Sequence, residues 1–163
     1  MSEVKDDLKI EGDVATWEMR MEGSVKGTYV GVFKFRCYLT PLQNIAAGKE
    51  QRELLGSNMA LATDHESFLA YALTQLKQRI ISAPPFWSST TPNKALEGDL
   101  PDENVIEAVL DAAIRSEIKY KEDKKRKKEE GIARADAAIN AINDQRQKEL
   151  EELQEAQSDD LPK

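Results

Sequence analysis

The chain has 163 residues, of which 33% are charged and 40% hydrophobic, and its net charge is −7 at neutral pH. This composition allows one modest core and indicates an extension that adds little to it. The negative charge disfavours a general nucleic-acid binder, because affinity for phosphate backbones depends on clustered positive charge. The single cysteine, Cys37, excludes an intrachain disulfide, and we interpret it as a small core residue.

The N-terminal residues 1–13 are charged and weakly patterned, which predicts a flexible terminus. They lack the apolar run of a signal peptide. No segment approaches the roughly 20 consecutive apolar residues that cross a bilayer. We therefore expect a protein that is synthesised in the cytoplasm.

Two runs with a period of two, residues 14–22 and 29–39, predict an antiparallel β-hairpin around a loop at 23–27 that contains two glycines. The apolar side chains of both runs then share one face, which requires a cover because an isolated hairpin is marginal in water. On the other face we expect acidic residues of the first strand near basic residues of the second: Glu18, Glu22, Lys34 and Arg36.

Three helices follow the hairpin. A capping box with proline at the first position predicts a helix over 41–55. A second capping box at 63–66 opens a helix that must end before Pro84. A third helix is predicted from residues 99–102, with acidic residues that complement the dipole, through Ile118. The fold class is therefore α+β: a head domain over 14–118, in which helices cover the hairpin.

A proline-rich segment between the second and third helices carries the adjacent aromatics Phe86 and Trp87. Large aromatics in an irregular segment either fold back as a plug in the core or serve as an anchor for a partner. The plug is the favoured alternative. In the alternative, in which the pair anchors a partner, Phe86 and Trp87 are candidate partner-binding residues.

The C-terminal third predicts an extended charged helix over 119–157 and a polar end at 158–163, although the sequence leaves open whether the helix continues through Gly131. Its aliphatic residues fall in a narrow seam with heptad steps followed by eleven-residue steps, as in a coiled coil. A lone helix gains nothing from such a seam in water, so we expect a partner or a second copy to cover it. The candidate contact residues are Ile132, Ala135, Ile139, Ile142, Leu150 and Leu153.

A basic run precedes the seam and consists of Lys124, Lys125, Arg126, Lys127 and Lys128. Acidic residues flank it at the spacing of helical ion pairs, so a salt-bridged and solvent-exposed helix is the favoured interpretation. Contact with nucleic acid through these five residues is the alternative.

No motif indicates catalysis. The only histidine, His65, lies beside two acidic residues where a surface position is expected. The carboxylates show no metal-ligand spacing, and the glycines form no phosphate-binding loop. We expect no enzymatic activity, cofactor or metal.

The layout resembles that of small proteins encoded among the structural genes of tailed bacteriophages, namely tail assembly chaperones and minor virion proteins. The resemblance is carried by the hairpin that ends in Leu39-Thr40-Pro41, by the segment 83–87, reading Ala-Pro-Pro-Phe-Trp, and by residues 102–106, reading Asp-Glu-Asn-Val-Ile. It implies a structural or accessory virion protein, made in the host cytoplasm, whose partners are capsid, tail-tube or tape-measure proteins, with a homo-oligomer as a further possibility. A chaperone that is absent from the mature particle is the alternative within the same resemblance.

Overall fold

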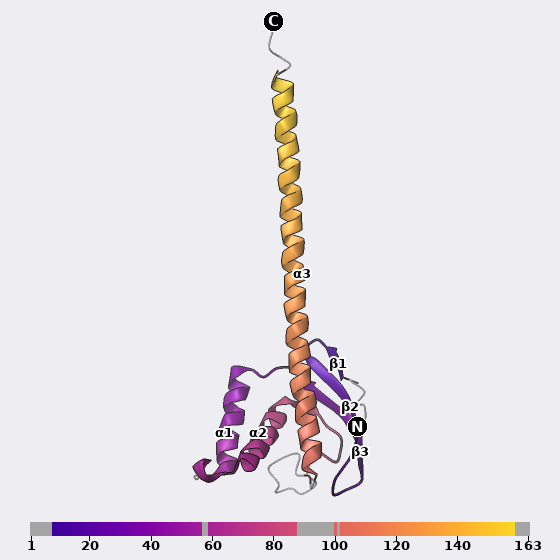
Figure 1. Cartoon of the computed structure of the whole chain (residues 1–163), viewed down its shortest axis with the longest axis vertical. Helices are drawn as coiled ribbons and strands as arrows, with labels where there is room; N and C mark the ends of the chain where they lie inside the picture. The colour runs from indigo at the N-terminus through magenta and orange to yellow at the C-terminus, as the bar shows by residue number, and fades with distance from the viewer. Residues whose placement is uncertain (1–7, 57–58, 88–99, 101, 159–163) are drawn as a thin grey trace. The chain divides into compact units, whose positions relative to one another are not determined.

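The computed structural model describes residues 8–56, 59–87, 100 and 102–158. They belong to two compact units that meet between Tyr120 and Lys121, here called the head unit and the helical unit. The elements in chain order are β1 (Leu8–Glu11), β2 (Val14–Glu22), β3 (Thr28–Arg36), α1 (Pro41–Leu55), the short 3₁₀ helix η1 (Met59–Leu61), α2 (Asp64–Arg79), β4 (Ile80–Ser82) and α3 (Glu103–Ser158) (Figure 1). The predicted α+β fold is confirmed.

The predicted hairpin is the centre of a four-stranded antiparallel sheet with the order β1-β2-β3-β4. β2 and β3 pair from Val14 opposite Arg36 to Glu22 opposite Thr28. The odd residues of both strands face the core, as the alternating pattern predicted.

The charge pairing expected on the outer face is found only in part: Glu18 is a diagonal neighbour of Lys34, whereas Glu22 and Arg36 lie at opposite ends of the strand pair. The register sets Glu18 opposite Val32, and Glu22 opposite Thr28, whose hydroxyl donates to the Glu22 carboxylate at 2.7 Å. Lys34 lies opposite Thr16 instead of an acidic residue. The tight loop fixes this register, so the acidic residues of β2 lie nearer the loop than the basic residues of β3.

The prediction of a flexible N-terminus over residues 1–13 is wrong for the part that the structure describes. Residues 8–11 form β1, in which Leu8 lies opposite Trp17 and is only 9% exposed. Burial of this leucine in the core ties the strand to the sheet, which a charged composition did not reveal. Residues 1–7 lie outside the described residues.

Both predicted capping boxes are present. The Thr40 hydroxyl accepts from the backbone N–H of Gln43 at the start of α1, and Thr63 does the same for Glu66 at the start of α2. α1 ends at Leu55, before Gly56 with φ of +72°. α2 ends earlier than its apolar pattern allowed, since Ile80 already belongs to β4, which pairs with β3. α1 and α2 lie side by side (Figure 1).

One core joins the sheet to α2, to the segment around Trp87 and to the first turns of α3. Phe33 lies at its centre, fully buried between Trp17 and Phe35 in the sheet and the ring of Trp87. α3 contributes small and branched side chains that allow close approach to the sheet: Val105, Ile106, Val109, Leu110, Ala112 and Ala113. The head unit is therefore a sheet covered on one face by helical and irregular segments.

The irregular segment packs tightly against Gly31 of β3. A Cβ atom at this position would lie 2.2 Å from Cγ of Pro84 and 2.5 Å from its Cβ. Gly31→Ala should therefore push Pro84 away and lower the free energy of unfolding by about 1–3 kcal/mol, as overpacking does. The matched control is Gly27→Ala, since no atom lies within 4 Å of a Cβ there. Equal urea midpoints for the two variants would refute the close packing.

α3 answers the question that the sequence left open, because it is one continuous helix from Glu103 to Ser158 that includes Gly131. The head unit extends two residues beyond the predicted boundary at 118, since the ring of Tyr120 stacks on that of Tyr38 with centroids 5.5 Å apart. No helix within the described residues has the length and apolar content needed to cross a membrane.

Candidate interaction surfaces

The aliphatic seam lies on the part of α3 that forms the helical unit. Its five large residues, Ile132, Ile139, Ile142, Leu150 and Leu153, are each between 52% and 61% exposed, and Ala135 is also exposed. At 100° per residue, all six fall within an arc of about 80° along about 32 Å of helix. The structure thus places the six predicted residues on one face of the helix, as an apolar stripe that Arg146 interrupts between Ile142 and Leu150.

The basic run forms one exposed turn of the same helix, and acidic neighbours pair with it. Asp123 contacts Arg126 at 2.5 Å and Lys127 at 2.7 Å, while Lys125 lies 4.0 Å from Glu129. Hydrogen bonding to Lys127 is the largest effect on the Asp123 carboxyl and lowers its pKa. Ion pairing within the helix is the favoured interpretation, and it leaves less positive charge for a phosphate backbone.

Phe86 and Trp87 fill the core, and the expectation of a partner anchor at these residues is corrected. Trp87 is 1% exposed, with its ring edge-on to Phe33 at 5.3 Å between centroids. Phe86 is partly buried and lies edge-on to Tyr29 at 5.0 Å. The hairpin face offers a wide apolar surface next to the proline segment, so burial there satisfies both rings without a partner.

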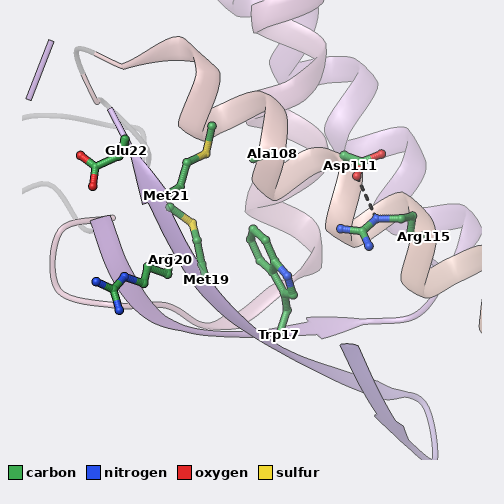
Figure 2. Close-up of a pocket in the computed structure, with 8 residues that line it drawn as sticks. All are labelled: Trp17, Met19, Arg20, Met21, Glu22, Ala108, Asp111 and Arg115. Atoms are coloured by element: carbon green, nitrogen blue, oxygen red, sulfur yellow. Dashed lines mark hydrogen bonds and ion pairs between the residues drawn. The ribbon is translucent and has the colours of Figure 1, made fainter. Parts of the chain in front are cut away.

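A groove of about 730 Å³ separates β2 from the first turns of α3 in the head unit. Trp17, Met19 and Met21 form its apolar floor and point toward the helix that carries Ala108 (Figure 2). An ion pair between Asp111 and Arg115, 2.8 Å apart, lies at its rim. The remaining lining residues are Arg20 and Glu22. The sequence pattern identified these methionines as core residues but gave no sign of a groove beside them.

Asp102 is the buried polar centre of the head unit. Its carboxylate accepts hydrogen bonds from the hydroxyl of Tyr29 at 2.7 Å, from the hydroxyl of Ser24 at 3.1 Å, and from the backbone N–H groups of Val25 and Lys26. Burial alone would raise its pKa, but these hydrogen bonds outweigh burial and lower the pKa to about 2.

The hydrogen bond that the Tyr29 hydroxyl donates to the Asp102 carboxylate also raises the pKa of Tyr29 to about 12, and burial raises this pKa further. The carboxylate thus fastens the hairpin loop to the start of α3. Asp102 directly precedes α3, which begins at Glu103, so it lies at the N-cap position and not in the first turn as predicted. Sequence reasoning missed the contact because the partners lie 73 to 78 residues away.

Asp102→Asn should lower the melting temperature at pH 7, because a neutral amide replaces a carboxylate that accepts hydrogen bonds from four donors. The folded pKa of about 2 lies below the ordinary 3.8, so the carboxylate stabilises the fold above about pH 4 and loses this effect as the pH falls toward 2. The gap in melting temperature between wild type and variant should narrow over that range. Asp111→Asn, whose side chain is 66% exposed, is the control. A constant gap would contradict this role of Asp102.

The other residues weighed for chemistry include a surface histidine and a buried cysteine. His65 lies on the surface with its Nε2 3.0 Å from a Glu103 carboxylate oxygen. Burial raises the pKa of the Cys37 thiol to about 11, which disfavours a reactive thiolate. Within the described residues, no three His, Cys, Asp or Glu side chains are grouped so that they could hold a metal ion.

Comparison of the chain with protein-family models, with curated proteins and with solved structures found no match.

Proposed function

We propose that this protein is a non-enzymatic interaction protein that associates with other molecules through the α3 seam. The observation that carries the proposal is the stripe of five aliphatic side chains, each more than half exposed, on one face of an otherwise charged helix. Fully burying an exposed side chain of this kind contributes about 1.5–3 kcal/mol, and covering the exposed half of five of them therefore favours association. The heptad steps from Ile132 to Ile142 favour a second helix as the covering surface.

A structural or accessory role in a tailed-phage virion is the setting we propose for this association. Support for it comes from the layout of hairpin, proline-aromatic segment and helices, which resembles small proteins of phage structural genes. Capsid, tail-tube or tape-measure proteins are then the partners, and a second copy of this chain is the simplest one to test. An assembly chaperone would use the same seam but leave before the particle is complete.

Light scattering of the full chain at several concentrations tests the association directly. We expect the mass to rise with concentration to at least that of a dimer. A monomer at every concentration would refute self-association. Mass spectrometry of purified particles then separates the remaining alternatives, because a virion component is present at a fixed copy number and a chaperone is absent.

A further inference from the structure

The outer edge of β2 presents backbone groups that no described strand pairs with. β1 pairs with β2 only at residues 14–17. The backbone N–H of Gly23 donates to the C=O of Gly27 at 3.1 Å, in the same register as the β2–β3 pairs. Hydrogen-bonded pairs alternate along an antiparallel ladder, so the odd residues of β2 bond toward β3 and the even ones away from it. The backbone groups of Glu18 and Arg20 therefore point outward.

The groove lies directly beside this edge (Figure 2). A strand that paired with the backbone of Glu18 and Arg20 would direct every second side chain to the same face as Met19 and Met21. Those side chains would enter the space between β2 and Ala108 of α3. The volume of about 730 Å³ accommodates several aliphatic side chains. Backbone pairing and apolar burial are thus available to the same ligand, which is the combination used in strand addition.

The outer face of the edge carries a charge pattern. Glu18, Arg20 and Glu22 are exposed and alternate in sign. Opposite charges directly across a strand pair contribute about 0.2–1 kcal/mol each, and like charges cost a similar amount. A strand with complementary charges therefore has the residue order basic, apolar, acidic, apolar, basic. This pattern is the same in both directions, so it suits either strand orientation.

We infer that the edge of β2 at Glu18 and Arg20, together with the groove, binds an extended strand of a partner protein with alternating charged and apolar residues. The C=O of Glu22 already accepts from the side-chain amide of Asn104 at 3.2 Å, so the pairing ends before it. The partner's basic residues face Glu18 and Glu22, and its acidic residue faces Arg20. Its apolar residues lie beside Met21, which is half-buried, whereas Met19 is only 2% exposed. This site lies in the head unit and does not depend on the α3 seam, so failure of one leaves the other intact.

A capped peptide, Thr-Lys-Val-Glu-Val-Lys-Thr, tests the site on the full chain by amide hydrogen exchange. In the free protein, the amides of Glu18 and Arg20 should exchange much faster than those of Met19 and Met21, which bond to β3. A saturating concentration of peptide should slow exchange at Glu18 and Arg20 at least tenfold. A peptide with the charges swapped, Thr-Glu-Val-Lys-Val-Glu-Thr, should bind at least about fivefold more weakly.

Arg20→Glu should weaken binding of the first peptide at least about fivefold, because its central acidic residue then meets a like charge. The matched control is Arg36→Glu, an exposed charge reversal on β3 that should leave binding unchanged. Two results would overturn the inference: no protection of Glu18 and Arg20 at millimolar peptide, or protection of both amides in the free chain, which would show that the edge is already occupied.

Discussion

Replacing both Ile139 and Ile142 with aspartate is expected to weaken association through α3 more than about 100-fold. The exchange removes two aliphatic side chains that the proposed interface would bury and sets two carboxylates in their place. Every 1.4 kcal/mol lost is a tenfold loss of affinity. Light scattering and analytical ultracentrifugation measure the change. The thermal transition of the head unit should remain at the wild-type temperature, because residues 139 and 142 lie in the helical unit.

The control for this variant is the pair Ala137→Asp and Ala141→Asp, which lies on other faces of the same turns. This control adds the same negative charge as the test variant and lowers helix propensity by more, so it accounts for the effects of charge and of helix destabilisation. This control should associate like the wild type. Equal weakening in the two variants would place the interface elsewhere on α3, and loss of the head transition would show that the unit boundary at Tyr120 is misplaced.

Trp87→Ala is expected to lower the free energy of unfolding by about 3–5 kcal/mol, the range for a fully buried tryptophan. The ring packs against Phe33 at the centre of the core, and the pocket that it leaves is walled by a sheet that cannot collapse easily. Urea denaturation monitored by circular dichroism measures the change. A domain of this size has a stability of about 5–15 kcal/mol, so the variant should unfold at much lower urea.

Leu61→Ala is the comparison for Trp87→Ala, because Leu61 is 79% exposed and its truncation should cost less than about 0.5 kcal/mol. A free energy of unfolding for Trp87→Ala within about 1 kcal/mol of wild type would contradict the interpretation that Trp87 fills the core. Such a result combined with lost partner binding would restore the anchor as the function of this tryptophan.

The elements with local signals were predictable. Period-two alternation identified β2 and β3, two capping boxes placed the starts of α1 and α2, and spaced aliphatic residues identified the seam on α3. Each of these signals comes from residues that are close together in the chain, where backbone geometry determines which side chains share a face. The short strands β1 and β4 have no such signal, because four and three residues are too few to show a period.

The sequence by itself determined the α+β class, the core faces of the hairpin, the starts of α1 and α2 and the aliphatic stripe of α3, since local periodicity and capping are properties of adjacent residues. Only the tertiary structure decided that Trp87 fills the core, that Asp102 holds the hairpin loop, and that a groove lies between β2 and the first turns of α3. These features depend on residues far apart in the chain, whose contacts are set when the sheet packs against α3. No local sequence pattern specifies which backbone and polar groups from distant parts of the chain come into contact.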